Sequence, residues 1–180
     1  MLEPMVQDYV TAAMELDRLA FCEPVKVAVL IRAIHGVENA FQTASTKALE
    51  GWEQGAVGLR TASLEHQAKV IELASMRAQR IEQITIGRAE ENDVVLQDET
   101  VSSHHAIFLR HPKTGEFLIQ DQESTNGSTL NGQPLLAYRS TRLHDSDVVG
   151  FGDTAFLFFS PEGFYDALQQ MISQGGEKGI

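Results

Sequence analysis

The stretch IEQITIGRAEENDVVLQDETVSSHHAIFLR (residues 81–110) decides the fold of this chain. Short apolar runs rich in β-branched residues alternate in it with polar, turn-forming clusters, and the same texture continues to residue 160. Regularly spaced short strands of this kind are typical of an all-β sandwich. We therefore predict a β-sandwich over residues 81–160. Its predicted strands are 84–86, 93–96, 106–109, 116–119, 148–151 and 155–159.

The first 80 residues have a helical period instead. Apolar residues recur at steps of three and four over 2–20, 27–52 and 64–81, which would line one face of a helix in each stretch. We predict a helical region over 1–80, either a bundle or a dimerisation arm. The fold class is thus an α and β multidomain chain.

One part of this helical region is ambiguous. Residues 25–33 also alternate apolar side chains at period two, as a half-buried strand would. The helical pattern continues past the length at which strands usually end, so we expect a helix here. A strand is the alternative.

A short helix is expected after the sandwich. Residues 160–162, Ser-Pro-Glu, supply a capping hydroxyl, a proline for the first helical position and an acid in the first turn. Phe164, Leu168 and Met171 follow on one face. Residues 161–180 are therefore predicted as a C-terminal helix and tail.

Composition excludes several classes of function. The formal net charge is -11 and the pI about 4.9, which disfavours non-specific binding to nucleic acid or to an anionic membrane. No apolar run approaches the roughly 20 residues that cross a bilayer, and residues 1–10 lack the basic start of a signal peptide. Cys22 is the only cysteine, so neither a disulfide nor a cysteine zinc site is expected. We expect a cytoplasmic protein without cofactor, metal, membrane insertion or nucleic-acid partner.

Polar residues that suit a phosphate fall on the predicted loops and strand ends. A phosphate with nearly two negative charges calls for a guanidinium, hydroxyls and amide donors. Loops at one end of a sandwich cluster in space, so residues far apart in the sequence can converge there. The candidate set is Arg88, Ser102, Ser103, Thr125 and Asn126.

Four short motifs follow one another between residues 87 and 132. They are Gly-Arg at 87–88, Ser-x-x-His at 102–105, Asn-Gly-Ser at 126–128 and Asn-Gly at 131–132. Their order and spacing resemble the forkhead-associated (FHA) domain, over about residues 81–160. The resemblance implies a sandwich that binds phosphothreonine on a partner protein.

The resemblance also implies roles for the candidate residues. Arg88 and Ser102 would contact the phosphate, with Thr125 and Ser103 close by. Asn126 would hold the backbone of the bound peptide with its side-chain amide. We treat these five residues as the predicted phosphopeptide-binding site.

A second group of residues is expected to shape the binding loops. In the family, the histidine that matches His105 is structural and braces these loops through hydrogen bonds. Gly87, Gly127 and Asn131 are expected to be architectural as well.

The chain departs from the family pattern in four places. Ser103 stands where arginine or asparagine is common, Ser128 replaces a threonine, and Ser146 stands where a glycine is frequent. The family also begins about two strands before Gly-Arg, where this chain has a helical pattern. Either the first strand is missing, or it is 25–34 followed by a helical insertion, or another chain supplies it.

Two functions without catalysis compete at this point. The first is a phosphothreonine-dependent adaptor in Ser/Thr kinase signalling, whose partner is a kinase substrate or the kinase itself. We expect targets with neutral or basic residues around the phosphothreonine, because the chain is acidic. The second is an oligomeric assembly protein, in which the helices self-associate, with Phe41 and Trp52 as core or interface residues, and the sandwich is structural or binds its own chain.

An enzyme is not expected, and we assign no catalytic residue. His104 and His105 are neighbours on a strand and point to opposite faces, so they do not easily share a metal ion. Ser102 lies three residues from His105, but no oxyanion-hole element or nucleophile elbow accompanies the pair.

Overall fold

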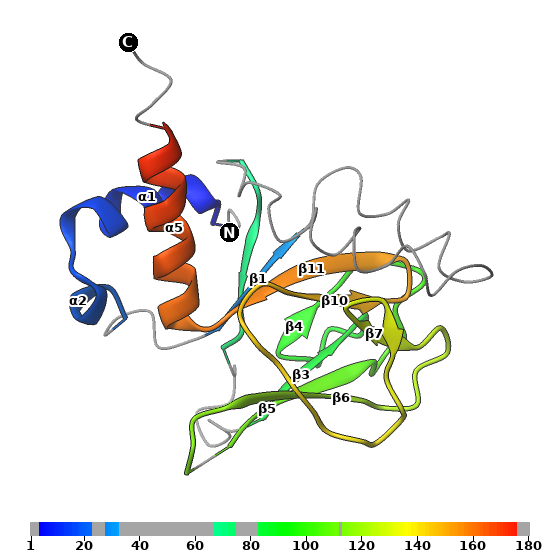
Figure 1. Cartoon of the computed structure of the whole chain (residues 1–180). Coiled ribbons are helices and arrows are strands. Elements are labelled where there is room, and N and C mark those ends of the chain that lie inside the picture. Colours follow the sequence, from blue (N-terminus) through cyan, green and yellow to red (C-terminus); the bar gives the residue numbers. More distant parts are fainter. Residues whose placement is uncertain (1–3, 23–27, 33–66, 75–82, 112, 176–180) are drawn as a thin grey trace, which may run out of the picture.

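Three helices lie beside a sandwich of two β-sheets in the part of the chain that the computed structural model describes, namely residues 4–22, 28–32, 67–74, 83–111 and 113–175 (Figure 1). The helices are α1 (Val6–Glu15), α2 (Arg18–Cys22) and α5 (Pro161–Gly175). The strands are β1 (Val29–Arg32), β2 (Val70–Glu72), β3 (Gln83–Gly87), β4 (Val94–Val95), β5 (Ala106–Arg110), β6 (Phe117–Asp121), β7 (Ser128–Leu130), β8 (Gln133–Pro134), β9 (Thr141–Arg142), β10 (Asp147–Phe151) and β11 (Thr154–Phe159). None of the described helices is long and apolar enough to cross a membrane.

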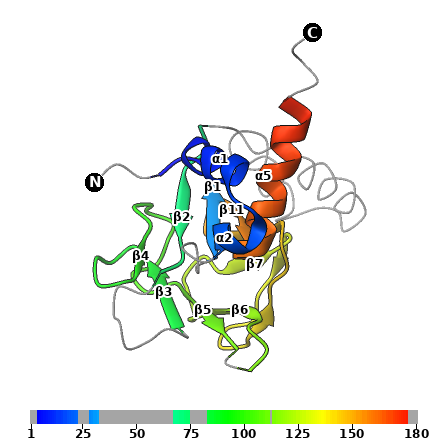
Figure 2. The same ribbon diagram turned by 90° about the vertical axis from the view of Figure 1, so that its left-hand side faces the viewer.

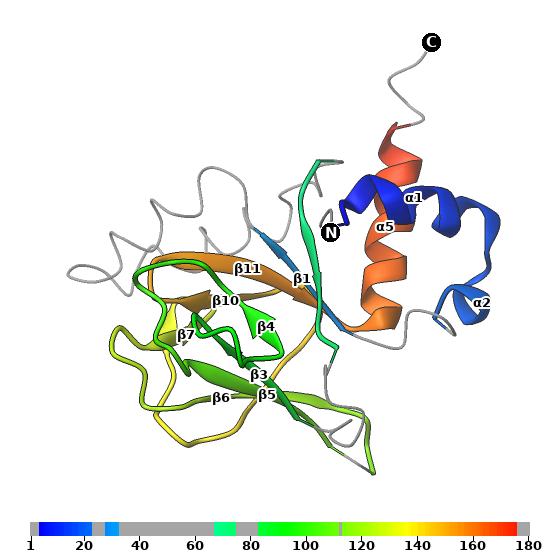
Figure 3. The same cartoon turned by 180° about the vertical axis from the view of Figure 1, so that it is seen from behind.

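The two sheets contain six and five strands. The six-stranded sheet has the order β2-β1-β11-β10-β7-β8, and the five-stranded sheet has the order β4-β3-β5-β6-β9. Neighbouring strands are antiparallel except for β3 and β4, which pair in parallel. Figure 3 shows β3, β5 and β6 of the five-stranded sheet below β10 and β11 of the six-stranded sheet.

The sandwich core lies between the inner faces of the sheets. Ile86, Phe108 and Ile119 of the five-stranded sheet pack there against Phe151 and Phe158 of the other sheet, and all five side chains are at least 98% buried. Phe108 and Phe158 stack with ring centroids 6.4 Å apart. Burial of this aromatic and aliphatic surface is the main source of stability for the sandwich.

A second core lies on the outer face of the six-stranded sheet, which the three helices cover (Figure 2). Phe21 from α2 and Phe164 from α5 are fully buried against side chains of β1, β10 and β11. The central strands β1, β10 and β11 are therefore buried on both faces. In β1, Leu30 points into the sandwich core while Val29 and Ile31 point toward the helices.

This double burial explains why the helix predicted for the described residues 28–32 is wrong. Residues 29–32 form β1, and 70–72, also predicted as helix, form β2. A strand covered on both faces is a continuous apolar run, and periodicity alone does not separate such a run from a buried helix. The alternation at period two was the correct signal for β1.

The first strand of the sandwich is therefore supplied by this chain. β1 pairs with β11 over four residues, from Val29 opposite Phe159 to Arg32 opposite Phe156. The sheet thus includes residues before position 81. Its edge strand β2 is itself covered, because the amide of Val70 donates to the Pro4 carbonyl at 2.8 Å. Such pairing protects an edge from other chains.

The predicted strands 84–86, 93–96, 106–109, 116–119, 148–151 and 155–159 correspond to β3, β4, β5, β6, β10 and β11. The strands β7, β8 and β9 were not predicted, because two or three residues are too few to establish a period. The helical positions Phe41 and Trp52 lie outside the described residues.

The C-terminal helix begins as the sequence predicts and packs on the sandwich. The Ser160 hydroxyl accepts the amide of Gly163 at 3.1 Å, which caps the first turn of α5. Phe164 and Leu168 are fully buried in the outer core. The Phe164 ring lies 6.3 Å from that of Phe159 at the end of β11.

Replacing Leu30 by alanine tests the assignment of β1 to the sandwich. Leu30 is fully buried, so Leu30→Ala should lower the free energy of unfolding by about 2–5 kcal/mol in a denaturant titration. Leu19 on α2 is 81% exposed, and Leu19→Ala should change it by less than about 0.5 kcal/mol. Equal effects of the two substitutions would contradict the described packing of β1.

Candidate functional site

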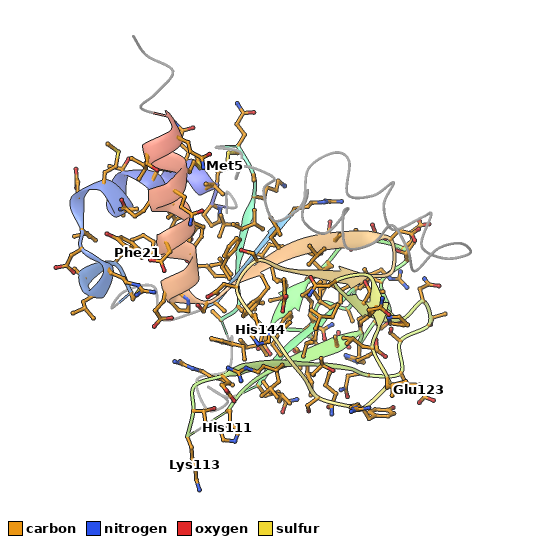
Figure 4. The ribbon with its side chains drawn as sticks, in the orientation of Figure 1. Met5, Phe21, His111, Lys113, Glu123 and His144 are labelled. Atoms are coloured by element: carbon orange, nitrogen blue, oxygen red, sulfur yellow. The ribbon has the colours of Figure 1, made fainter. Side chains whose placement is uncertain are left out.

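Three loops meet at one end of the sandwich, and we call them the loop cluster. They are the β3–β4 loop (88–93), the β4–β5 loop (96–105) and the β6–β7 loop (122–127). The opposite end carries the β5–β6 hairpin. Figure 4 shows this separation, with Glu123 of the loop cluster far from His111 and Lys113 at the tip of that hairpin.

Backbone hydrogen bonds join the first two loops directly. The amide of Arg88 donates to the Ser102 carbonyl at 2.9 Å, and the amide of Ala89 donates to the Ser103 carbonyl at 3.2 Å. Asn92 reinforces this contact, since its Nδ2 donates to the Ser103 carbonyl at 2.7 Å. The approach requires glycine at position 87, because a Cβ there would lie 2.3 Å from the Ser103 carbonyl oxygen.

Arg88 presents an exposed guanidinium at this end. Its Nε donates to the Val101 carbonyl at 3.2 Å, which fixes the side chain along the β4–β5 loop. Among the described residues, no carboxylate forms an ion pair with it. The outer nitrogens of the guanidinium are thus left to face solvent, as a site for a bound anion requires.

The hydroxyls of Ser102 and Thr125 lie next to one another, although 23 residues separate them. Their oxygens are 3.3 Å apart, and the backbone amide of Thr125 donates to Ser102 Oγ at 2.9 Å. Both contacts are exposed. The pair links the β4–β5 loop to the β6–β7 loop at the surface of the cluster.

Asn126 is held from the β4–β5 loop. Its Nδ2 donates to the Thr100 carbonyl at 2.8 Å, which leaves its Oδ1 and one N–H directed to other partners. Thr100 is fixed in turn by Asp98, whose carboxylate accepts both its hydroxyl at 2.6 Å and its amide at 2.8 Å. These two hydrogen bonds lower the pKa of Asp98 below its usual value.

The imidazole of His105 is fully buried beneath these loops and connects them. The amide of Ser102 donates to His105 Nδ1 at 3.0 Å, so the ring proton lies on Nε2. Nε2 faces the Gly127 carbonyl at 3.2 Å and donates to it. Burial lowers the pKa of His105 below 6.5, because it disfavours the charged ring. The geometry therefore holds a neutral histidine.

Asp121 organises the third loop in the same buried layer. Its carboxylate accepts the amide of Ser124 at 3.0 Å and the hydroxyls of Ser124 at 2.7 Å and Ser128 at 2.5 Å. Burial alone would raise the pKa of Asp121, but the hydrogen bonds from Ser128 and Ser124 hold it below its usual value.

The structure places all five residues of the predicted phosphopeptide-binding site in the loop cluster. Arg88, Ser102, Thr125 and Asn126 all lie in the loop cluster. Ser103 lies there too, but it contributes its carbonyl to the contact between loops, and its side chain is exposed. Their part in binding a peptide stays a prediction.

Of the residues expected to shape the loops, Gly87, His105 and Gly127 contact the cluster, whereas Asn131 does not lie in it. Asn131 follows β7 and ties its turn to the start of β10. Its Nδ2 donates to Asp147 Oδ1 at 2.8 Å, and its Oδ1 accepts the amide of Val148 at 3.0 Å.

Sequence reasoning gave no role to three residues that fix the loops, namely Asn92, Thr100 and Asp121. A signal was present for two of them. Asp98-x-Thr100 and Asp121-x-x-Ser124 have the spacing at which an aspartate accepts hydrogen bonds from a following turn. The role of Asn92 rests on a contact with Ser103, eleven residues away, which no local pattern reveals.

The geometry does not arrange Ser102 and His105 as nucleophile and base. The imidazole accepts the backbone amide of Ser102, while the Ser102 hydroxyl contacts Thr125. His104 is exposed and faces Glu91 at 3.4 Å, whereas His105 is buried. No group of three acidic, histidine or cysteine side chains gathers as a metal site within the described part of the chain.

The class of site that follows from this geometry is a surface cradle for an anion. One guanidinium, two adjacent hydroxyls and a side-chain amide lie on these loops, which a buried polar layer holds in place. Charge-assisted hydrogen bonds from such donors suit a phosphate or carboxylate group.

Comparison with known families agrees with the fold. Residues 84–152 match the family model described as the FHA domain. The chain therefore contains an FHA domain, preceded by N-terminal helices and followed by a C-terminal helix.

Two similar proteins each match less than half of this chain. An ABC transporter ATP-binding/permease protein of Mycobacterium tuberculosis is 39% identical over 75 residues, which cover 42% of this chain and 8% of that protein. An oxoglutarate dehydrogenase inhibitor of Corynebacterium diphtheriae is 38% identical over 74 residues, covering 41% and 48% respectively. The match thus spans less than half of either relative.

Among solved structures, the N-terminal FHA domain from S. cerevisiae Rad53p, in complex with a phosphothreonine peptide, superposes with a TM-score of 0.46 at 24% identity. The superposition covers 54% of this chain and 88% of that one.

Acid should destabilise the fold through His105. The unfolded chain binds a proton at this histidine below about pH 6.5, while the folded chain resists it because the pKa of the buried ring is lowered. The free energy of unfolding should therefore fall as the pH drops below about 6.5. Denaturant titrations between about pH 7.5 and 5 measure this slope. His105→Asn should be less stable at neutral pH and have a shallower slope. An unchanged slope would contradict the neutral, buried state of His105.

Proposed function

We propose that this chain is a phosphothreonine-dependent protein-binding adaptor. An FHA domain is a phosphopeptide-binding module rather than a catalytic one, and we assign this chain no catalytic residue. In this proposal the loop cluster receives the phosphothreonine side chain of a partner protein. Arg88 and Ser102 bind the phosphate, Thr125 and Ser103 flank it, and Asn126 holds the peptide backbone.

One observation carries the proposal. The guanidinium of Arg88 is exposed and pairs with no carboxylate of the described residues. The backbone amide of Arg88 donates to the carbonyl of Ser102, whose hydroxyl lies 3.3 Å from that of Thr125. In an acidic chain, an exposed arginine on a loop that is hydrogen-bonded to Ser102 favours an anionic ligand over a purely structural role. The buried His105 and Asp121 hold the loops in position, so little ordering free energy opposes binding.

The partner is proposed from the chemistry of the modification. Phosphothreonine in a protein is the product of a Ser/Thr kinase, so the partner is a substrate of such a kinase or the kinase itself. This assigns the chain to kinase signalling, in the cytoplasm where such partners would be available.

Removing the guanidinium tests the proposal. A short phosphothreonine peptide library should contain sequences that bind the protein, while their unphosphorylated forms do not. Arg88→Ala should weaken binding of those peptides about tenfold or more, since a hydrogen bond to a charged group contributes about 1.5–3 kcal/mol. Fluorescence anisotropy measures both affinities.

Arg142 provides a matched control. It is an exposed arginine at the opposite end of the sandwich, paired with Glu116 at 2.8 Å. Arg142→Ala removes the same charge but should leave the phosphopeptide affinity within about twofold, because screening weakens its effect at that distance. Absence of any phosphate-dependent binding, or an equal loss in both variants, would refute the proposal.

Self-association is the second candidate function. Met14, Leu16 and Leu19 are 67%, 38% and 81% exposed where α1 leads into α2. Exposed apolar side chains close together can bury against another chain. Analytical ultracentrifugation of the protein and of Leu19→Lys would detect a dimer that the substitution weakens, and a monomer at all concentrations would exclude this candidate.

A further inference from the structure

The loops that surround Arg88 are strongly acidic. The three loops of the cluster and the adjoining β10–β11 turn contain one arginine and seven carboxylates. These carboxylates belong to Glu90, Glu91, Asp93, Asp98, Glu99, Glu123 and Asp153. A phosphate dianion that enters the cradle therefore meets attraction from Arg88 and repulsion from the surroundings.

Some of these carboxylates are engaged by the protein itself. Asp98 accepts hydrogen bonds from Thr100, Glu91 faces His104 at 3.4 Å, and Glu123 accepts the Tyr138 hydroxyl at 3.1 Å. Each of these interactions reduces the capacity of the carboxylate to pair with a ligand.

Glu90 and Glu99 differ from them. Both are exposed, and neither has an ion pair or side-chain hydrogen bond with any described residue. Glu90 lies two residues after Arg88 in the β3–β4 loop, and Glu99 lies three residues before Ser102 in the β4–β5 loop. The backbone contact between Arg88 and Ser102 joins these two loops, so both glutamates belong to the loops that carry the cradle.

We propose that Glu90 and Glu99 select phosphothreonine peptides with arginine or lysine close to the phosphothreonine. The inference rests on the proposed function and names the class of partner sequence. A cationic side chain beside the phosphate pairs with these free carboxylates and offsets the repulsion that the acidic loops exert on the phosphate. An acidic neighbour adds to that repulsion. Complementary charges of this kind set specificity and the rate of association.

The test uses three short phosphothreonine peptides that differ only in the residues on both sides of the phosphothreonine, which are arginine, alanine or glutamate. The wild-type protein should bind the arginine peptide about fivefold to tenfold more tightly than the alanine peptide, and the glutamate peptide most weakly, as a few exposed charge pairs predict. The differences should shrink at about 1 M salt, where the Debye length is about 3 Å.

Two pairs of substitutions separate local charge from net charge. Glu90→Lys with Glu99→Lys should abolish or reverse the preference for arginine, and the paired Gln substitutions should reduce it. The control pair is Glu15→Lys with Glu162→Lys, at exposed glutamates of α1 and α5. It changes the net charge by the same amount as the Glu90/Glu99 lysine pair. The order of the three peptide affinities should stay that of the wild-type protein. If both pairs of lysine substitutions change the order of the three peptide affinities equally, the inference is wrong.

The two possible failures are distinguishable. If no peptide binds better with its phosphate than without it, the proposed function itself fails. If all three phosphopeptides bind with equal affinity, or the Glu90/Glu99 lysine variant keeps the arginine preference, phosphothreonine binding stands and the selection by Glu90 and Glu99 is wrong.

Discussion

The buried imidazole of His105 holds two loops of the site at once, and the geometry of the cradle depends on it. Its Nδ1 accepts the amide of Ser102 and its Nε2 donates to the carbonyl of Gly127. Both bonds exist together only for a neutral ring with its proton on Nε2. The ring also packs edge-on against Phe151, with centroids 5.5 Å apart, so the sandwich core fixes its position. The stability of the core thereby determines where Ser102 and Thr125 lie.

Asp121 complements this arrangement in the same buried layer. A buried carboxylate is costly unless its oxygens are satisfied, and three donors from Ser124 and Ser128 satisfy them. The polar groups under the loops are thus used internally. The polar groups on the surface of the loops, above all the guanidinium of Arg88, are left for a ligand. This division between a satisfied buried layer and an exposed donor set is what makes the cradle suitable for an anion.

The helices have a separate role in the architecture. They cover the outer face of the six-stranded sheet, at the side of the sandwich rather than at its loop end (Figure 1). Phe21 and Phe164 fill this second core. The N-terminal segment also pairs with the edge strand β2. This pairing covers the free edge of the six-stranded sheet.

Much of the loop end could be predicted from the sequence, because its residues are polar, lie in turn clusters and follow a recognisable order. Arg88, Ser102 and Asn126 were found in this way. The strand β1 was kept only as an alternative to a helix. Val29, Leu30 and Ile31 are all buried, so no polar face supported the alternation at period two against the longer helical pattern. The contacts of Asn92 and Asp121 depend on how the loops meet in three dimensions, and a single sequence does not specify these distances.

Amide chemical-shift changes in a ¹H–¹⁵N NMR titration with a bound phosphothreonine peptide test the central claim most directly. The amide of Thr125 donates to Ser102 Oγ and the amide of Arg88 donates to the Ser102 carbonyl, so both report on a ligand at the cradle. The largest changes are expected in the loop cluster, at residues 88–93, 96–105 and 122–127. Changes confined to the β5–β6 hairpin or to the helices would contradict the central claim.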